Sequence, residues 1–355
     1  MNILYLTNEL SKLNGWATVG VELIAELRDQ HHVIVISKKG DPHNPGHALI
    51  SGDHYKTPIT LLSDARNILR KLQGQRIDAI ICGIEPYLPL AALLKLKLDK
   101  PRLMLLGHGT YIYFPFVKGM RKILNRQFAR SVDTLVVPSR FTFEKALTWW
   151  KGPMNIVHWG VNLNDYHPVA GLPKEPAFIC VGALKQRKGV DLLLSAFAGL
   201  ARKHPEARLY LVGSASDKYI KRAAELGIQN QVVFTGKVSH EALLHYYSRS
   251  LCHVLVSNNT ESAFEGYGLV HLEANACGIP SIGASGTANE DVIVDGYNGF
   301  LCGQDDPHQL AALMERILTN ADEYAALCAN SLNYARERNW RSAALQLTAL
   351  LFPET

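Results

Sequence analysis

The sequence predicts an α/β protein of two Rossmann-like domains, each with a parallel sheet that has helices on both faces. Short apolar runs of strand length alternate with helical patterns along both halves of the chain, which is typical of such sheets. The chain has 355 residues, more than one hydrophobic core usually holds, so two domains are expected. Residues 166–176 contain three prolines and have the composition of a linker between the domains.

The first half alternates strands and helices from its first residues. The turn at 8–17, which includes Asn14-Gly15-Trp16, is expected to join the first strand to the first helix, where glycine lets a phosphate or an acceptor approach the backbone. A simple turn remains the alternative. Residues 41–60 predict irregular structure. We expect strands at 2–7, 32–37, 78–82, 103–106, 134–138 and 155–158, and helices that include 19–28 and 139–150.

The second half repeats this rhythm and ends in helices. Its apolar runs and helical patterns again predict a parallel sheet wound on both faces. We expect strands at 177–183, 208–212, 232–235, 253–257 and 281–283, helices at 189–202, 216–227, 240–249 and 269–277, and a helical end at 307–318, 322–337 and 341–351.

Composition and charge narrow the classes of partner. The chain is 47% hydrophobic and 19% charged, as in a globular protein, and its net charge of +5 suits phosphate-bearing ligands or an anionic membrane but is too small to indicate nucleic acid. Six scattered cysteines lie mostly in apolar runs and predict buried thiols in a reducing compartment. We expect no signal peptide and no membrane span of about 18 apolar residues. A cytoplasmic protein, with peripheral contact to the inner face of a membrane, is therefore predicted.

A glycine turn followed by a short helix carries most of the functional prediction. Glu265 and Glu273 stand eight residues apart, with Gly266 and Gly268 between them. Backbone N–H groups at the start of the expected helix favour an anion such as phosphate. Glu273, about one helical turn further on, is well placed to accept hydrogen bonds from ribose hydroxyls. The alternative is an ordinary helix start beside two glutamates, since a glycine turn by itself is a weak signal.

A basic loop and a histidine at a strand end add to this pattern. Lys185-Gln186-Arg187-Lys188-Gly189 lies between an expected strand and helix, where cations can clamp a diphosphate. His108 lies between two glycines just after the strand at 103–106, at the edge where open α/β sheets bind ligands. A solvated loop and a histidine bonded to loop backbone are the alternatives.

Residues 112–130 combine an aromatic cluster with a basic segment. Lys118, Arg121, Lys122 and Arg126 have spacings that place them on one face of an expected helix. Such a face can rest on anionic lipid or receive a lipid-phosphate acceptor. The alternative is the solvated face of a packed helix.

Glu265 and Glu273 form an E-x7-E signature, and the segment Glu-Gly-Tyr-Gly-Leu-Val-His-Leu-Glu-Ala resembles that of the retaining glycosyltransferases of family 4. The resemblance implies the GT-B fold, in which two Rossmann-like domains face each other across a central cleft. It also implies an acceptor domain at 1–168, a nucleotide-sugar domain at 169–338 and a helix at 339–355 that returns to the first domain. Further segments resemble the family in order along the chain: 157–162, 181–191, 208–213, 233–238, 286–290, 295–300 and Trp340.

The resemblance also implies an activity and the residues that serve it. The protein would transfer a hexose (glucose, mannose, galactose or an N-acetylhexosamine) from a nucleoside diphosphate sugar to a glycan or lipid-linked acceptor, with α-configuration retained and no metal or other cofactor. Bacterial cell-surface polysaccharide or glycolipid synthesis is the expected setting. Because no protein nucleophile is evident, a front-face mechanism is expected, in which the leaving phosphate helps to deprotonate the acceptor.

The resemblance implies a role for each residue of this sequence that matches a position of the family's motifs. Arg187 and Lys188 would hold the diphosphate, Glu265 the sugar hydroxyls and Glu273 the ribose, with His108 near the reacting centre. The remaining residues expected to line the donor site are glycines, strand ends and the glycine turn: Gly15, Gly182, Gly213, Val238, Gly266, Tyr267, Gly268 and Leu269.

Two departures and three alternatives accompany the resemblance. Ala183 stands where the family often has arginine, so Arg187 is expected to supply that charge, and the segment 256–264 is longer than the family's usual Pro-Ser. A nucleotide-sugar epimerase of the same architecture, or a non-catalytic protein that binds nucleotide sugars, would share these features. A dinucleotide oxidoreductase would need G-x-G-x-x-G after the first strand, and residues 7–20 do not contain it.

Overall fold

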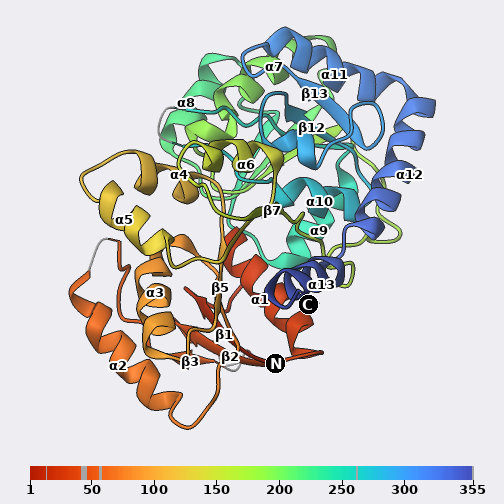
Figure 1. The fold of residues 1–355 in the computed structure, drawn as a ribbon. Helices are drawn as coiled ribbons and strands as arrows, with labels where there is room; N and C mark the ends of the chain where they lie inside the picture. Colours follow the sequence, from red (N-terminus) through yellow and green to blue (C-terminus); the bar gives the residue numbers. More distant parts are fainter. Residues whose placement is uncertain (13, 41–45, 56–57, 261–262, 354–355) are drawn as a thin grey trace. The chain divides into compact units, whose positions relative to one another are not determined.

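The computed structural model describes residues 1–12, 14–40, 46–55, 58–260 and 263–353 (Figure 1). The chain divides into two compact units, one made of Met1–Trp159 with Trp340–Thr355 and the other of Gly160–Asn339. The boundary between the two units therefore follows Trp159, whereas the resemblance implied a first domain that ends at residue 168.

Unit 1 contains a parallel sheet of seven strands in the order β3-β2-β1-β4-β5-β6-β7, as Figure 1 shows for part of the sheet. The order reverses at β1, which pairs with β2 on one side and β4 on the other. Ligands of open parallel sheets bind near such a reversal, outside the carboxyl ends of the strands. The strands are β1 (Asn2–Thr7), β2 (His32–Ser37), β3 (His47–Ala48), β4 (Ala79–Cys82), β5 (Arg102–Leu106), β6 (Thr134–Val137) and β7 (Met154–Ile156).

Helices cover both faces of this sheet because successive strand side chains alternate in direction. Leu4 and Leu6 of β1 belong to the core cluster that includes Ile68 and Leu90 from the helices of one face. Tyr5 faces the other side, toward Gly20. The helices are α1 (Gly15–Arg28), η1 (Pro58–Thr60), α2 (Leu61–Lys71), η2 (Glu85–Tyr87), α3 (Leu88–Lys97), α4 (Thr110–Val117), α5 (Lys122–Ala129) and α6 (Arg140–Leu147).

The C-terminal helix α13 (Trp340–Leu351) belongs to unit 1 and packs beside α1 (Figure 1). The indole of Trp340 lies 6.3 Å from that of Trp159, centroid to centroid, with the rings 23° from parallel. His31, just after α1, contacts the Thr348 hydroxyl at 3.1 Å. The packing against α1 and these two contacts attach the C-terminal helix to the rest of unit 1.

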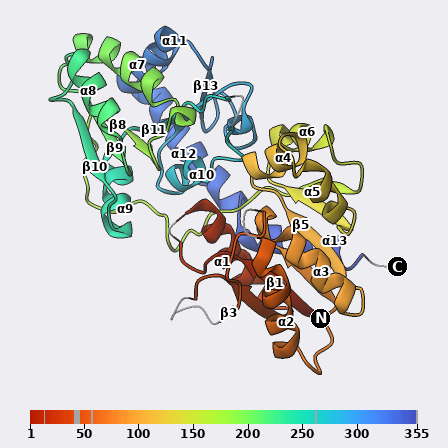
Figure 2. The same ribbon diagram turned by 90° about the vertical axis from the view of Figure 1, so that its left-hand side faces the viewer.

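Unit 2 contains a parallel sheet of six strands in the order β10-β9-β8-β11-β12-β13, part of which Figure 2 shows. Phe178 and Cys180 of β8 pack toward α7 and α11, while Ile179 and Val181 pack toward α9 and α10. The strands are β8 (Ala177–Val181), β9 (Arg208–Val212), β10 (Val232–Gly236), β11 (Cys252–Leu255), β12 (Ser281–Ala284) and β13 (Gly299–Cys302). The helices are η3 (Gln186–Lys188), α7 (Val190–Lys203), α8 (Asp217–Glu225), α9 (His240–Arg249), α10 (Leu269–Ala276), η4 (Ala288–Asp291), α11 (Pro307–Thr319) and α12 (Ala321–Glu337).

The predicted α/β class with parallel sheets is confirmed. The segment 41–60, expected to be irregular, contains the two-residue strand β3, and three further local predictions are wrong. Strand β13 was missed because it begins with Gly299, and glycine weakens a strand pattern. Glycine is needed there, since a Cβ would lie 1.9 Å from Ser281 O. Helix α1 begins at Gly15, not at residue 19, because the Asn14 side chain caps it by accepting from Ala17 N at 3.1 Å.

The third wrong prediction concerns the basic segment. The aromatic residues themselves form α4, and a break containing Gly119, with φ +86, precedes α5. Lys118 and Arg121 lie at the ends of these helices, so the four cations do not share one helix face.

Candidate active site

The loop that joins β8 to α7 brings the predicted cations to the carboxyl edge of the unit 2 sheet. It ends at Gly189, whose φ is +67 and where a Cβ would lie only 1.9 Å from Val256 O, just beyond β11. Only glycine allows this close approach. Asn258 N also donates to Arg187 O at 2.9 Å. The backbone that carries Arg187 and Lys188 is thus held against the end of the neighbouring strand.

Arg187, Lys188 and Glu265 form one ion cluster. A single carboxylate oxygen, Glu265 Oε2, lies 2.6 Å from Arg187 Nη1 and 2.5 Å from Lys188 Nζ. The Glu265 side chain is only 14% exposed. Burial alone would raise its pKa, but the charges and hydrogen bonds of the two cations outweigh burial and lower the pKa to about 2. The cluster therefore has a charged carboxylate and a net charge of about +1 at neutral pH.

The glycine turn leads from this cluster into α10. Gly268 has φ +99 and precedes the first helical residue, Leu269, and as a glycine it has no side chain that could cap this end of the helix. A Cβ at Gly268 would lie 2.9 Å from the His271 ring and 3.2 Å from Asn289 Nδ2. Both Asn289 Nδ2 and His271 Nε2 are buried and lack a hydrogen-bond partner in the described chain. Uncapped N–H groups at a helix start favour an anionic ligand.

Two buried histidines lie beneath the turn. His253 of β11 and His271 of α10 approach to 3.2 Å between their Nδ1 atoms, and both are fully buried. Burial, with the nearby Lys188 ammonium, lowers the pKa of His271 to about 3, so this ring is neutral at physiological pH. One Nδ1 must carry a proton that the other accepts.

Glu273 lies on α10 two residues after His271. The Tyr247 hydroxyl donates to Glu273 Oε2 over 3.5 Å, a long hydrogen bond. Burial raises the pKa of Glu273 to about 7, although hydrogen bonds from Tyr166 and Tyr247 lower it in part. This carboxyl therefore titrates near neutral pH, unlike Glu265.

The other residues predicted to line the donor site have structural positions that limit what their side chains can do. Gly182 and Gly213 lie at the ends of β8 and β9 and pack backbone to backbone, since a Cβ at Gly213 would lie 2.0 Å from Gly182 O. Val238 is partly buried and packs against the hydrophobic cluster on the side of the sheet that α9 and α10 cover. Gly266 and Tyr267 belong to the glycine turn, and both residues are buried, Tyr267 with only 4% of its surface exposed.

His108 lies in unit 1, after β5. Its backbone N donates to Glu85 Oε1 at 2.7 Å, and its Nε2 lies 2.7 Å from Gly83 O. Burial lowers the pKa of His108 to about 4, and the hydrogen bond to Gly83 only partly offsets this. The ring is therefore neutral at pH 7. Its centroid lies 6.1 Å from that of Trp159.

Gly15 is the first residue of α1, and no described atom lies within 4 Å of a Cβ built there. The Asn14 side chain that caps α1 also donates to Glu9 Oε1. Of the four basic residues expected to face an acceptor or membrane, Arg121 donates to Tyr55 O, and Arg126 Nε donates to Phe116 O at 2.7 Å. Lys118 and Lys122 are exposed.

Four residues of these sites were not predicted. Glu85 could have been found by the rule that singled out His108, because it also follows a strand end. Tyr166 lies in the segment that was assigned to the linker. His253 and His271 are buried within a strand and a helix, and only the fold brings them together.

The described residues contain neither a metal-binding cluster nor a membrane-spanning helix. No group of three or more His, Cys, Asp or Glu side chains has an arrangement that could hold a metal ion. No described helix is long and apolar enough to cross a membrane.

Two units with parallel sheets and a cationic, glycine-bounded turn at the edge of the second define a glycosyltransferase of the GT-B class. Residues 164–338 match the family model "Glycosyl transferases group 1", and residues 13–165 match "Glycosyltransferase Family 4". The chain belongs to family 4 of the glycosyltransferases.

Relatives and solved structures agree with this assignment. The chain is 25% identical to the GDP-mannose-dependent alpha-(1-6)-phosphatidylinositol monomannoside mannosyltransferase of Mycolicibacterium smegmatis, over 98% of each protein. It is 31% identical to the D-inositol 3-phosphate glycosyltransferase of Thermobispora bispora over 55% of this chain, and it spans about half (49%) of that protein.

Two solved structures show the same fold over nearly the whole chain. Sucrose-phosphate synthase from Thermosynechococcus elongatus has a TM-score of 0.81 and 22% identity, over 98% of each chain. Anabaena HepE in complex with UDP-glucose has a TM-score of 0.80 and 18% identity, over 99% of each chain.

Proposed function

We propose that this glycosyltransferase transfers a hexose from a nucleoside diphosphate sugar to a glycan or lipid-linked acceptor, retains the α-configuration and needs no metal ion. The observation that carries the proposal is the ion cluster of Arg187, Lys188 and Glu265 beside the uncapped start of α10. Two cations and the backbone N–H groups at a helix start suit a diphosphate whose charge grows as the sugar leaves. The names of the M. smegmatis mannosyltransferase and of the HepE complex with UDP-glucose support a nucleotide-sugar donor.

Each residue has a role in the proposed reaction. Lys188 and Arg187 offset charge on the leaving diphosphate, with backbone N–H groups at Gly268 and Leu269. Glu265 accepts hydrogen bonds from the sugar hydroxyls while it stays charged between its two cations. Glu273 accepts hydrogen bonds from the ribose hydroxyls. In unit 1, neutral His108 accepts a hydrogen bond from the transferred sugar.

The mechanism that fits these groups is front-face transfer. Lys188 and Arg187 stabilise the departing phosphate, and that phosphate takes the proton of the acceptor hydroxyl as the new bond forms on the same face. The carboxylate of Glu265 is held by both cations through Oε2, which lowers its basicity and its nucleophilicity. We therefore assign Glu265 to binding the sugar and not to attacking it.

The decisive experiment uses a panel of UDP-, GDP- and ADP-sugars in EDTA, with and without candidate acceptors. Release of nucleoside diphosphate from one donor, with an α-linked product by NMR, is expected. An inverted linkage would overturn retention, and activity only after a divalent metal is restored would overturn metal independence. Conversion of the donor sugar without a glycoside would indicate an epimerase, and binding without turnover of any donor would indicate a non-catalytic protein.

The basic segment after α4 supports a second part of the proposal, contact with an anionic membrane. Met120, Ile123 and Leu124 are exposed beside Lys118 and Lys122. No acidic residue occurs between 101 and 132. Exposed apolar side chains among cations suit insertion at the surface of an anionic bilayer.

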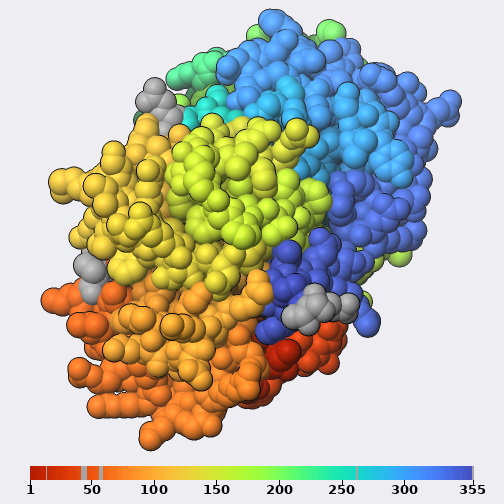
Figure 3. Space-filling view, viewed as in Figure 1, coloured from red at the N-terminus to blue at the C-terminus, as the bar shows by residue number. Residues whose placement is uncertain are grey.

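The same charge pattern extends to the neighbouring helices α2 and α3, drawn in orange in Figure 3. An apolar groove of about 440 Å³ lies between them, and Arg66, Arg70 and Lys97 contribute to its walls. The only acidic residue of α2, α3 and α5 is Asp64, which is buried. This part of unit 1 therefore presents cations and apolar surface together.

Sedimentation with vesicles tests this contact. The double variant Lys118→Glu/Lys122→Glu should reduce binding to phosphatidylglycerol vesicles at least about tenfold, since each cation near such a surface contributes about 1 kcal/mol. Lys221→Glu, an exposed lysine on α8, is the matched control. Equal binding of all three proteins, or equal binding of the wild type to phosphatidylcholine, would contradict the membrane contact.

A further inference from the structure

Glu85 is a buried carboxyl that the proposed reaction does not use. It begins η2, just past the end of β4, and is fully buried. Its Oε1 accepts the backbone N–H of His108 at 2.7 Å, whereas its Oε2 has no hydrogen-bond partner in the described chain. A buried polar group costs free energy, so a carboxyl at this position needs an explanation.

The segment that contains Glu85 also binds the side chain of His108. A carbonyl oxygen can only accept a hydrogen bond, so the 2.7 Å contact with Gly83 O requires a proton on His108 Nε2. Because the ring is neutral, Nδ1 is then left as an acceptor. Residues 83–85 therefore determine both where the His108 backbone lies and which ring nitrogen can accept a hydrogen bond.

The surroundings of Glu85 favour a neutral carboxyl. The titratable groups near it are Cys82 of β4, His108 of the next loop, and Tyr55, which belongs to the segment that precedes α2. None of these is a cation at neutral pH. Burial raises the pKa of Glu85 to about 7, although the hydrogen bond from His108 opposes it. The contact with His108 needs only an oxygen of Glu85 that accepts the backbone N–H, and it does not need a charged carboxylate.

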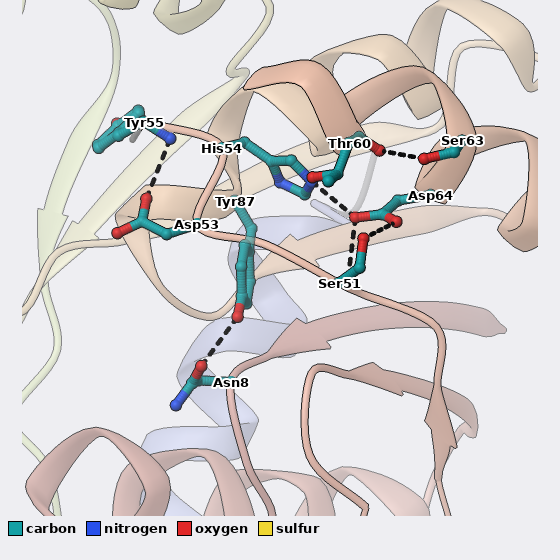
Figure 4. A network of polar contacts seen from close by, with 9 residues as sticks. All are labelled: Asn8, Ser51, Asp53, His54, Tyr55, Thr60, Ser63, Asp64 and Tyr87. Atoms are coloured by element: carbon teal, nitrogen blue, oxygen red, sulfur yellow. Dashed lines mark hydrogen bonds and ion pairs between the residues drawn. The ribbon is translucent and has the colours of Figure 1, made fainter. Parts of the chain in front are cut away.

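A neighbouring polar network holds η2 in place (Figure 4). The hydroxyl of Tyr87, at the end of η2, donates to Asn8 Oδ1 at 2.9 Å. The Tyr87 ring packs edge-on against that of His54, 5.7 Å away, and His54 Nε2 lies 2.9 Å from Asp64 Oδ2. This network links η2 to the end of β1 and, through His54, to α2. The carboxyl of Glu85 therefore extends from a braced segment.

We infer that Glu85 is a positioning residue for the transfer reaction: through Oε1 it holds the loop 107–109 so that His108 presents Nδ1 to a hydroxyl of the transferred sugar. The inference rests on the proposed role of His108. Glu85 itself need not touch the sugar. Its glutamine analogue keeps the same acceptor oxygen, whereas leucine removes it and keeps a similar volume.

The test compares Glu85→Gln, Glu85→Leu and His108→Ala with the matched control Glu22→Leu, a buried glutamate of α1 that contacts Lys12. Transfer rates, binding of the nucleoside diphosphate and melting temperatures are measured for each protein. Glu85→Leu should lower kcat about 100-fold, because misplacing a reacting group by about 1 Å costs that much. Glu85→Gln should stay within about threefold of wild type. Nucleotide binding should change in neither, because the proposed nucleotide site lies in unit 2.

Nitrogen NMR of the His108 ring gives a readout that a merely structural role would not change. The wild type and Glu85→Gln should show the Nε2–H form, and Glu85→Leu a mixture of both ring forms. If Glu85→Leu does not fold, this spectrum and the rate of Glu85→Gln still decide the matter. A Glu85→Gln protein that is folded yet loses 100-fold in kcat, or that shows mixed ring forms, would overturn the inference.

The remaining outcomes separate the inference from the proposed function. Glu85→Leu with wild-type kcat, beside an inactive His108→Ala, would overturn the positioning role alone. Full activity of His108→Ala would overturn the placement of His108 in the proposed function, and the role of Glu85 with it.

Discussion

Glu85 of unit 1 and Glu265 of unit 2 are two poorly exposed carboxyls, each beyond the carboxyl end of a parallel sheet, with opposite electrostatics. Burial opposes ionisation of both. Glu265 faces Arg187 and Lys188 within 2.6 Å, and its pKa falls to about 2. Glu85 receives one backbone N–H at 2.7 Å, and its pKa rises to about 7. Burial alone does not set the charge of such a group; the partner that the fold supplies does.

This contrast separates two tasks of a transferase. A charged cluster suits a site where charge builds on a leaving diphosphate. A neutral carboxyl that accepts one hydrogen bond suits the positioning of a neighbouring group. Four experiments test this contrast, and the one with the greatest predicted change in activity is described first.

Replacing Lys188 with alanine should lower kcat by about 100- to 1,000-fold, the usual cost of removing one preorganised group that stabilises developing charge. Arg187 would remain beside Glu265 but could not replace a second cation. Steady-state transfer assays with the donor that the panel of nucleotide sugars selects would measure the effect. Lys185→Ala, an exposed lysine of the same loop, is the control. Normal turnover of Lys188→Ala would remove the ion cluster from the active site.

Glu265→Gln and Glu85→Gln should change the pH dependence of stability in opposite directions. Glu265 contributes stability above pH 4.5, and the protein loses it as the pH falls toward 2. Glu85 contributes stability below pH 4.5 that is lost as the pH rises through 7. Each change in pKa from 4.5 corresponds to about 3 kcal/mol in the free energy of unfolding.

Urea titrations of the wild type and both variants between about pH 2 and pH 9 measure these losses. Glu265→Gln should lack only the loss of stability at low pH, and Glu85→Gln should lack only the loss of stability as the pH rises through 7. Parallel curves for the two variants would contradict the opposite environments described here.

Two glycine substitutions compare the turns of the two units. Gly268→Ala should cost about 1–3 kcal/mol of stability, because alanine at a φ of +99 is strained and its Cβ would lie 2.9 Å from His271. Gly15→Ala should leave stability within about 0.5 kcal/mol, since no described atom obstructs that Cβ. A stable Gly15→Ala protein with much reduced transfer would show that a ligand approaches this backbone. Unchanged transfer would remove Gly15 from the site.

Glu273 is the intermediate case, since it has the raised pKa of Glu85 and lies near the cluster of Glu265. A ribose hydroxyl binds best to the ionised carboxylate, so the affinity for nucleoside diphosphate should rise up to about tenfold between about pH 6 and pH 8. Calorimetric titration would measure this rise. It should be absent in Glu273→Gln, and its persistence there would assign the pH dependence to another group.

Much of the fold and of the candidate site could be predicted from the sequence. The alternation of apolar strands and helices predicted both parallel sheets, because buried parallel strands read as short apolar runs. Glu265, Arg187 and Lys188 were singled out from their positions after strands and before helices, and the structure joins them in one cluster. Strand β13 was missed because it begins with Gly299, a residue that weakens a strand pattern, and its pairing with β12 is visible only in the fold.

The residue types, their order and the strand ends where they stand, and with them the glycosyltransferase family, could be read from the amino-acid sequence. The partners of these residues became known only from the fold: Glu265 meets two cations, Glu85 meets a backbone N–H, and His253 meets His271. The physical reason is that charge and hydrogen bonding depend on atoms within about 4 Å, and such neighbours come from distant parts of the chain.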